Sequence, residues 1–460
     1  MNRTFANQRV TIIGMAREGT ALARFLTQEG ARVTVSDIKG IAELADEIGQ
    51  LAGLPIQAVL RGHPDDILDA DVMFISPGVP RAIPIIQEAD RRGLPLSSET
   101  ELFFELCPAP IVGVTGSSGK TTTTTLIGEM MKVDRRRKVW IGGNIGRPLI
   151  GHVGELQPDD WVVLELSSFQ LENLGRSPHI AVVTNLRPNH LDRHLSYEAY
   201  KAAKANILRY QSADDVAVLN WDDPEVRTLA EMTAARVRWF SRQESLEEGT
   251  VVEDGWIVVK HDGKCERIMR VAELALRGEH NLENALAALS AVTATGIKGG
   301  SAARVARAFQ GVPHRLERVR EHNGVLWIND SIATSPDRTL AALRAYPDES
   351  LILLAGGRDK HLPMELMAQE IVKRVKCLIT FGESARLVEQ AVDAARMEMN
   401  GSGRPLPIVS CDTLEEAVEQ AHTIAEPGDL VLLSPSGTSF DAFKDFEERG
   451  ERFRDLVNAF

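Results

Sequence analysis

The chain has 460 residues, a length typical of two to four domains at roughly 100–200 residues each. Hydrophobic residues make up 43% and charged residues 25%, so a disordered chain is not expected. Lys and Arg total 52 against 65 Asp and Glu, a net charge of −13, which disfavours general nucleic-acid binding. A local anion site made of backbone N–H groups stays compatible with that charge.

The cysteines are far apart and form no CxxC or Cys/His cluster, so we expect reduced thiols rather than a zinc site or disulfides. No apolar run reaches the about 20 residues that span a bilayer, and no signal-peptide pattern follows the N-terminus. These features predict a cytoplasmic protein without a membrane span. The four thiols are Cys107, Cys265, Cys377 and Cys411.

The first hundred residues alternate apolar strand patterns with helical ones. Strands are predicted at 9–14, 32–37 and 72–78, and a helix at 21–30. Continuous apolar strands separated by helices indicate a parallel sheet buried on both faces. The stretch CPAP at 107–110 is a natural boundary, so the first domain is predicted to span residues 1–107.

A second unit begins at the strand 111–116. Further strands are predicted at 139–143, 161–166 and 180–186. Residues 250–265 alternate in polarity around two Asp-Gly turns, which predicts a small antiparallel element added to the sheet. Ala-rich helices follow at 281–296 and 301–310, and this domain is predicted to span residues 108–313.

The strand and helix pattern restarts near residue 314 and continues to the end of the chain. The apolar strands lie at 325–330, 350–357, 377–382, 407–410 and 429–436. The third domain is therefore predicted to span residues 314–460. The whole pattern predicts an α/β protein of three domains, each built on a mainly parallel sheet with flanking helices.

The segment VTGSSGKTTTTT at 114–125 follows a strand and opens a helix. Glycines in such a loop allow successive N–H groups to face an anion, Lys120 can reach the β/γ-phosphates, and the Thr121 hydroxyl can bind Mg²⁺. The spacing differs from the common G-x-x-x-x-G-K-[ST] loop, which would need glycine at 114. We interpret the segment as an ATP site, with an ordinary Ser/Thr-rich turn as the alternative. Its residues are Gly116, Ser117, Ser118, Gly119, Lys120, Thr121 and Thr122.

The first loop, GMAREG at 14–19, is similar to a dinucleotide-binding loop except that Ala16 replaces the middle glycine. This replacement argues against an NAD-dependent oxidoreductase. The loop could still bind a different diphosphate. Asp37 ends the second strand, where it could accept a hydrogen bond from a ribose or a uracil. A plain βαβ turn is the alternative.

Three further side chains follow strands or lie on a helix near the predicted phosphates. Glu165 ends a buried strand and could help to bind Mg²⁺, and His190 lies in the loop after the next strand, with Asp192 and His194 as weaker candidates. Lys204 falls on the apolar stripe of the helix 196–210, where an ammonium is costly unless it is paired or neutralised. A snorkelling side chain is one explanation, and a functional, modified lysine is the other.

Several strings together resemble the Mur ligases, ATP-dependent amino-acid ligases of peptidoglycan precursor synthesis. They include the phosphate loop, NIGRP (144–148), LELSSFQLE, NHLDRH, YKAAK, GEHNLENALAA (278–288), HRLE (314–317) and NDSIATSPD (329–337). The N-terminal unit with SPGVP (76–80) and the tail at 434–450 favour the member that adds D-glutamate to UDP-N-acetylmuramoyl-L-alanine. The resemblance covers essentially the whole chain.

The resemblance implies one domain for each substrate and a catalytic set of Lys120, His190 and Lys204, with Lys204 N-carboxylated. It implies a metal site for Mg²⁺ at Thr121, Glu165, His190 and Lys204. ATP contacts beyond the loop are implied at Asn281, Asn284, Arg315 and Asp330. Contacts to the UDP-sugar are implied at Gly14, Ala16, Arg17, Asp37, Ser76, Pro77, Gly78 and Asn144. D-Glutamate contacts are implied at Thr334, Lys360, Ser439 and Phe446. The partners implied are these small molecules, with no nucleic acid, and we expect a monomer.

The sequence departs from the family pattern at two positions. Ile332 stands where many relatives have lysine, so any role of that lysine must fall to another cation, such as Arg338 or Lys360. Asn189 stands where some relatives have aspartate. A P-loop ATPase or binding protein, which would need no acceptor amino acid, is the remaining alternative to a ligase.

Overall fold

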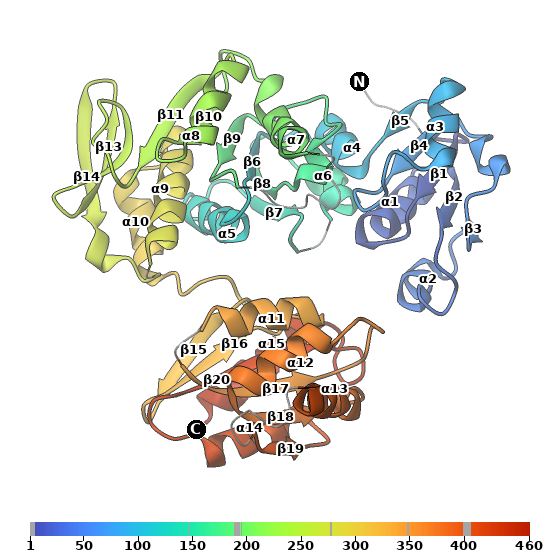
Figure 1. Ribbon diagram of the computed structural model, residues 1–460. Helices are drawn as coiled ribbons and strands as arrows, with labels where there is room; N and C mark the ends of the chain where they lie inside the picture. The colour runs from blue at the N-terminus through green and yellow to red at the C-terminus, as the bar shows by residue number, and fades with distance from the viewer. Residues whose placement is uncertain are drawn as a thin grey trace. The chain divides into compact units, whose positions relative to one another are not determined.

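The computed structural model describes residues 5–146, 148–187, 194, 196–276, 278–346, 349–398 and 406–460. They form two compact units, Met1–Phe309 and Gln310–Phe460. The first unit holds two sheets and the second holds one (Figure 1). The α/β fold with three mainly parallel sheets and flanking helices agrees with the prediction.

The N-terminal sheet is entirely parallel, with the strand order β3-β2-β1-β4-β5. Its strands are β1 (Arg9–Ile13), β2 (Arg32–Asp37), β3 (Ile56–Leu60), β4 (Val72–Ile75) and β5 (Leu96–Ser97). The helices are α1 (Arg17–Gln28), α2 (Ala45–Leu51), η1 (Asp65–Leu68), α3 (Pro84–Arg91) and α4 (Glu99–Leu106). The order reverses beside β1, so the loop after β1 opens at the switch point where α/β sheets bind ligands.

The middle sheet has nine strands in the order β14-β13-β12-β11-β10-β9-β6-β8-β7. Its strands are β6 (Ile111–Thr115), β7 (Val139–Gly143), β8 (Trp161–Glu165), β9 (Ile180–Val183), β10 (Val216–Asn220), β11 (Arg236–Ser241), β12 (Gly249–Glu253), β13 (Trp256–His261) and β14 (Lys264–Arg270). Strands β12, β13 and β14 pair antiparallel at one edge, as the two Asp-Gly turns predict (Figure 1). Strand β6 lies between β8 and β9, so the phosphate loop also leaves a switch point.

Helices cover both faces of the middle sheet, with α5, α9 and α10 together on one of them (Figure 1). The helices are α5 (Lys120–Met131), η2 (Leu149–Glu155), α6 (Ser168–Leu171), α7 (Tyr197–Arg209), α8 (Pro224–Arg227), η3 (Thr228–Met232), η4 (Val271–Glu273), α9 (Glu279–Ala294) and α10 (Gly299–Ala308). The stripe predicted for α7 is buried at Tyr200, Ile207 and Leu208. One hydrophobic cluster contains Val10 of β1, Leu102 of α4 and Leu164 of β8, so the two sheets of this unit share a core.

The C-terminal sheet has the order β15-β16-β20-β17-β18-β19 and is parallel except for the hairpin of β15 and β16. Its strands are β15 (Glu317–His322), β16 (Val325–Asn329), β17 (Ser350–Gly356), β18 (Val375–Phe381), β19 (Ile408–Ser410) and β20 (Asp429–Ser436). The helices are α11 (Pro336–Arg344), α12 (Glu365–Arg374), α13 (Ala385–Glu398), α14 (Leu414–Ile424) and α15 (Phe446–Asn458).

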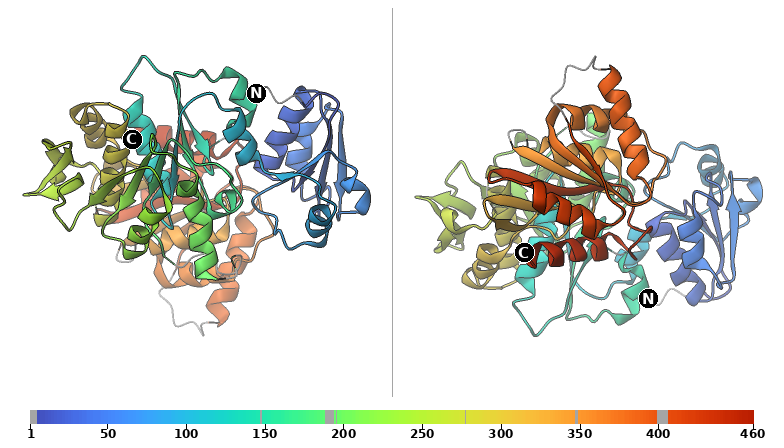
Figure 2. Two further views of the ribbon diagram at one scale, coloured as in Figure 1. Left: turned by 90° about the horizontal axis from the view of Figure 1, so that it is seen from above. Right: turned by 90° about the horizontal axis from the view of Figure 1, so that it is seen from below.

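Both faces of the C-terminal sheet are buried. Alternate residues of β17 enter two different clusters, with Leu351 and Leu353 on one face and Ile352 and Leu354 on the other. The orange and red helices of this unit lie on both sides of its strands in Figure 2. This burial explains the continuous apolar run of β17.

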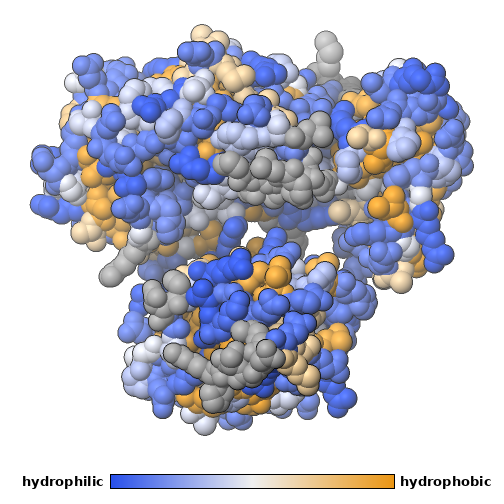
Figure 3. All heavy atoms as spheres, viewed as in Figure 1, coloured by the Kyte–Doolittle hydropathy of each residue, from blue (hydrophilic) through white to orange (hydrophobic). Residues whose placement is uncertain are grey.

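All four cysteines are free, as predicted. Within the part of the chain that the structure describes, no helix is both long and apolar enough to cross a membrane. The face drawn in Figure 3 is mainly hydrophilic, with hydrophobic residues scattered over it.

Candidate functional site

The loop between β6 and α5 is shaped by two glycines. Gly116 has φ +154, and a Cβ there would lie 1.9 Å from Thr184 Oγ1. Gly119 has φ +77 at the N-cap of α5, and a Cβ there would lie 2.2 Å from Asn284 Oδ1. Side chains at either position would clash, so glycine is required for the close approach of these elements. No side chain caps α5, which leaves its N-terminal dipole directed at the loop.

The loop is held from the adjacent strand end. Asn185 Oδ1 accepts from the Ser118 backbone N–H at 2.9 Å, and Thr184 Oγ1 donates to Ser118 O at 2.7 Å. Ser117 Oγ lies 2.9 Å from the Tyr200 hydroxyl. No local motif marks Thr184, Asn185 or Tyr200 as site residues. The position of the first two after β9, a neighbour of β6, could have indicated them.

Lys120 folds back over the predicted phosphate loop. Its Nζ donates to Gly116 O at 2.9 Å and to Ser117 O at 3.3 Å. Thr122 is the third residue of α5, two positions after this lysine. The ammonium therefore lies over the loop in which anionic oxygens would be cradled by N–H groups.

Glu165 meets the loop from the end of β8. It is 2% exposed, and its two oxygens accept from Thr121 Oγ1 and from Asn144 Nδ2, both at 2.7 Å. Carboxylate and hydroxyl oxygens are the hard ligands that Mg²⁺ prefers, so this pair fits the metal predicted there. Asn144, for which a contact to the UDP-sugar is predicted, donates its amide hydrogen to Glu165.

Lys204 lies at the same loop and is 1% exposed. Its Nζ donates to Gly116 O at 2.9 Å and Thr115 Oγ1 at 3.2 Å, and lies 4.9 Å from the centre of the Tyr200 ring. Burial lowers the pKa of Lys204 well below its usual value, the charge of Lys120 lowers it further, and Glu165 opposes both. Among the described residues no carboxylate forms an ion pair with Lys204, so its buried amine is held by neutral oxygens alone.

Two predicted ATP residues lie on α9, which packs against α5. Asn284 Oδ1 accepts from Thr123 Oγ1 at 3.2 Å, and Asn284 Nδ2 donates to Asn281 Oδ1 at 3.4 Å. The structure therefore brings both amides to the start of α5. His190, Asn189 and Asp192 lie outside the described residues. His194 is 4% exposed, stacks on Phe169 and lies 2.9 Å from Ser168 Oγ, which indicates a packing role.

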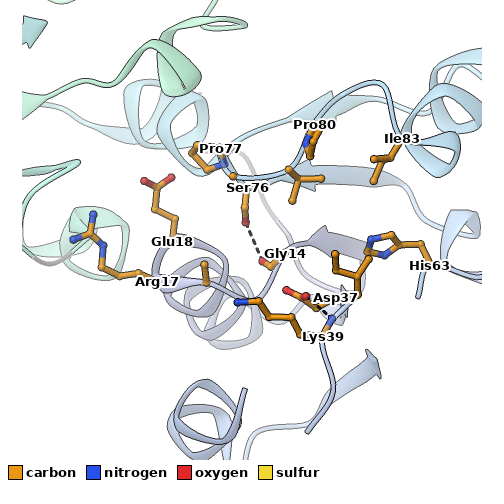
Figure 4. Close-up of a pocket in the computed structure, with 14 residues that line it drawn as sticks. Gly14, Arg17, Glu18, Asp37, Lys39, His63, Ser76, Pro77, Pro80 and Ile83 are labelled. Carbon is orange, nitrogen blue, oxygen red and sulfur yellow. Dashed lines mark hydrogen bonds between the residues drawn. The ribbon is translucent and has the colours of Figure 1, made fainter. Parts of the chain in front are cut away.

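The N-terminal sheet carries a cavity of about 420 Å³ at the carboxyl ends of β1, β2 and β4 (Figure 4). Seven of the eight residues predicted to contact the UDP-sugar line it; Asn144 does not. They are Gly14, Ala16, Arg17, Asp37, Ser76, Pro77 and Gly78. Topology brings these loops together because the carboxyl ends of parallel strands share one edge of a sheet.

Asp37 is fixed by the backbone in this cavity. Its carboxylate accepts from the Met15 N–H at 2.8 Å and the Lys39 N–H at 2.9 Å, and it is 9% exposed. Ser76 Oγ donates to Gly14 O at 2.9 Å, which ties the loop after β4 to the loop after β1 (Figure 4). The site is therefore built from hydrogen bonds between its loops.

Arg17 and Glu18 point from α1 toward the middle sheet (Figure 4). The Arg17 guanidinium donates to Gly146 O at 2.9 Å and Gly143 O at 3.3 Å. Glu18 accepts from the Gln170 side chain at 2.8 Å, and burial raises its pKa. Sequence reasoning missed Glu18 and Gln170, since nothing local pairs residues 152 positions apart.

Three of the predicted D-glutamate residues, Thr334, Lys360 and Ser439, follow strands β16, β17 and β20 at the carboxyl edge of the C-terminal sheet, and Phe446 begins helix α15. Lys360 Nζ lies 3.4 Å from Thr334 Oγ1, and Arg338 donates to Ile332 O at 2.9 Å. Both cations that could replace the missing lysine are thus near position 332. Ser439 is 2% exposed, and its carbonyl accepts from the Phe443 N–H at 2.8 Å.

The predicted ATP contacts of this unit are Arg315 and Asp330. Asp330 is 5% exposed and accepts from the Leu316 N–H at 3.1 Å and the Ser434 hydroxyl at 3.0 Å. Burial raises the pKa of Asp330 to about 7 against these hydrogen bonds. Arg315 lies directly before Leu316, in the turn that Asp330 holds.

Arg449 is a side chain that sequence reasoning missed. It is fully buried, and its guanidinium donates to Ser331 O at 2.9 Å, Ser331 Oγ at 3.0 Å and Thr438 O at 3.1 Å. Ser331 Oγ in turn donates to the Phe446 carbonyl at 2.8 Å. One arginine of α15 therefore ties this helix, which begins at Phe446, to the loops that carry Thr334 and Ser439.

Three family models match consecutive parts of the chain, one for each sheet. They are the Mur ligase MurD-like N-terminal domain at residues 8–98, the Mur ligase middle domain at 114–292 and the Mur ligase glutamate ligase domain at 314–437. A relative from Acetivibrio thermocellus named UDP-N-acetylmuramoylalanine–D-glutamate ligase is 45% identical over 98% of this chain and 97% of its own. The chain belongs to the Mur ligase family.

Another Mur ligase of the same name, from Symbiobacterium thermophilum, is 43% identical over 98% of each chain. Solved structures of more distant members share the fold. UDP-N-acetylmuramate-alanine ligase MurC from Thermotoga maritima has a TM-score of 0.53 at 19% identity, over 98% of this chain and 100% of its own. MurF from Acinetobacter baumannii has a TM-score of 0.53 at 15% identity, over 98% of this chain and 93% of its own.

Proposed function

We propose that this Mur ligase uses ATP to join D-glutamate to UDP-N-acetylmuramoyl-L-alanine in the synthesis of peptidoglycan precursors. The observation that carries the proposal is the 43–45% identity, over 98% of the chain, to relatives named for this reaction. The cavity beside Asp37, the loop beside Lys120 and the loops joined by Arg449 support the proposal of one substrate site in each part of the fold.

The reaction that fits these sites has two steps. The carboxylate of UDP-N-acetylmuramoyl-L-alanine attacks the γ-phosphate of ATP, forming an acyl phosphate and ADP. The amine of D-glutamate then attacks the acyl carbon, forming the amide and releasing phosphate. Both steps need positioning and charge stabilisation more than covalent participation by the protein.

The residues of the middle domain would stabilise the phosphates. Lys120 and the N–H groups at the start of α5 would bind the β- and γ-phosphate oxygens. Thr121, Glu165 and carboxylated Lys204 would hold Mg²⁺, together with His190, because a carbamate converts the buried amine into an oxygen ligand. The metal, when bound, offsets the repulsion between the carboxylate and the phosphates.

The C-terminal loops would bind D-glutamate. Lys360 and Thr334 offer a cation and a hydroxyl to a carboxylate, Ser439 lies in the loop that Arg449 holds, and Phe446 begins the helix of Arg449. Arg315 and Asp330 would contact ATP. In this proposal the domain boundaries at residues 107 and 313 separate the parts of the chain that bind the UDP-sugar, ATP and D-glutamate. Action in the cytoplasm and as a monomer stay predictions of the sequence.

The test measures ADP release with UDP-N-acetylmuramoyl-L-alanine and a panel of amino acids. We expect release that depends on D-glutamate and on the nucleotide sugar, and a chain carrying Lys120→Met that releases none. Release without any amino acid would identify a P-loop ATPase instead. Reduction of NAD in the same mixture would identify an oxidoreductase.

A further inference from the structure

The cavity of the N-terminal sheet has two chemically different ends. At one end lie Gly14 and Ala16, where the N-terminus of α1 favours an anion. At the other lies the apolar side chain of Ile83, beside His63 (Figure 4), and Ile38 also lines the cavity. Phosphates fit the first end, and the flat, largely apolar ring of a nucleobase fits the second.

Hydrogen bonding fixes the tautomer of His63. Ser36 Oγ lies 3.1 Å from Gly62 O and 2.8 Å from His63 Nδ1, and Ser36 is fully buried. The serine has one hydrogen, and the carbonyl can only accept, so Ser36 donates to Gly62 O. Its oxygen must then accept a hydrogen from Nδ1, which leaves Nε2 with a lone pair and no hydrogen.

Among the described residues, Ser36 is the only hydrogen-bonding partner of the His63 side chain. Burial lowers the pKa of His63, and the Asp37 carboxylate only partly opposes this, so the ring is neutral near pH 7. A neutral ring with its hydrogen on Nδ1 is an acceptor at Nε2.

We propose that His63 determines which nucleobase the cavity accepts, by accepting a hydrogen bond at Nε2 from the N3–H of uracil. The inference rests on the proposed function, which places a uridine diphosphate in this cavity. Uracil carries a hydrogen at N3, whereas cytosine carries only a lone pair there and would face the lone pair of Nε2. His63 would therefore select uridine over cytidine nucleotides, and Ser36 would act as its positioning residue.

The test measures dissociation constants by titration calorimetry of the full chain with three probes: UDP, CDP and 3-methyluridine diphosphate. The wild-type chain should bind UDP about tenfold more tightly than either other probe, because each lacks the N3–H. His63→Phe should weaken UDP binding about tenfold and bring the three constants close together. Ser36→Ala removes the hydrogen bond that fixes the tautomer of His63. The preference for UDP should therefore fall, while the cavity lining stays intact.

Asp65→Asn is the matched control, two residues from His63 on an exposed carboxylate outside the cavity, and it should leave all three constants unchanged. Equal wild-type affinity for UDP and 3-methyluridine diphosphate would overturn the inference without any variant. An unchanged preference in both His63→Phe and Ser36→Ala would overturn it as well. Absence of UDP binding by the wild-type chain would overturn the proposed function itself, and the inference with it.

Discussion

The helical pattern of the sequence predicts that Lys204 is buried, but it does not explain why a lysine occupies a buried position. The helical period puts it on the buried stripe of α7, and the structure adds that its Nζ contacts Gly116 O, 88 residues away. Burial lowers the pKa of this amine and so favours its neutral form, which is the form that can add CO₂. The cost of burying this side chain is therefore explained if its working form is a carbamate that faces the metal.

Lys204→Ala should reduce ligase turnover by about a hundredfold or more, because the metal would lose an oxygen ligand beside the phosphates. Short carboxylates such as acetate should restore part of the activity, and ADP release measures both effects. Lys201→Ala is the matched control, on the same helix and paired with Glu225 at the surface. Wild-type turnover by Lys204→Ala would contradict the carbamate.

Asp330 gives a pH dependence whose sign follows from its raised pKa. The folded carboxyl holds its proton up to about pH 7, whereas its ordinary pKa is 3.8. Between these values the folded state binds more protons than the unfolded state, so the free energy of unfolding falls as pH rises. Below about pH 4 the penalty is absent, and above about pH 7 it is complete.

Asp330→Asn should remove this part of the pH dependence. At pH 8 it should raise the free energy of unfolding by about 2–4 kcal/mol over wild type, and at pH 4 by little. Asparagine can still accept from the Leu316 N–H, so the turn should persist. Urea unfolding of both chains at several pH values measures the difference. The exposed Asp393→Asn on α13 should show no such change, and an equal gain at both pH values would contradict the assignment.

At the scale of elements, the loop after β1 depends on how closely α1 approaches it. A Cβ on Gly19 would lie 2.0 Å from Gly14 O, a backbone atom that cannot swing away. Gly19 is the last glycine of the GMAREG segment, where such glycines allow close packing of helix on strand. The segment thus keeps the packing glycine although Ala16 replaces the middle one.

Gly19→Ala should lower the free energy of unfolding by about 1–3 kcal/mol, because α1 must move from its sheet. Gly49→Ala is its counterpart on α2, where nothing lies within 4 Å of the new Cβ. That change should instead stabilise the chain by about 0.5–1 kcal/mol, because alanine favours the helix. Thermal unfolding of both variants compares them directly, and a loss of stability in both would show that packing at Gly19 is not the cause.

The strands that the sequence predicted are the ones with strong local signals. Strands β1, β6, β8 and β17 are apolar runs buried on both faces, and the β12–β14 hairpin carries two Asp-Gly turns. The edge strand β3 was missed, since its residues are exposed or half-buried and show no continuous apolar run. The buried strand β10 was also missed, although its apolar run could have indicated it.

At the scale of the whole molecule, the hydrophobic core divides the chain differently from the predicted domains. One cluster joins the N-terminal and middle sheets, whereas the clusters of β17 contain only residues of the C-terminal unit. The core therefore separates near residue 310, close to the predicted boundary at 313, and is continuous across the predicted boundary at 107.

Residues 310–460 expressed alone should fold cooperatively, because both faces of their sheet are buried by their own helices. Residues 1–107 expressed alone should be markedly less stable than residues 1–309, because Leu102 and its neighbours would lose partners in the middle sheet. Circular dichroism and urea unfolding of the three fragments measure this. Equal stability of residues 1–107 alone and within 1–309 would contradict a shared core.

The sequence by itself determined the phosphate loop and the strands around it. Gly116, Gly119, Lys120 and Thr121 lie within one short segment, and their chemistry depends on local backbone geometry that a short motif encodes. Only the tertiary structure decided the partners of Lys204, Glu18, Arg449 and His63. Each bonds to a group outside its own element, and packing selects such partners among many that share no local period.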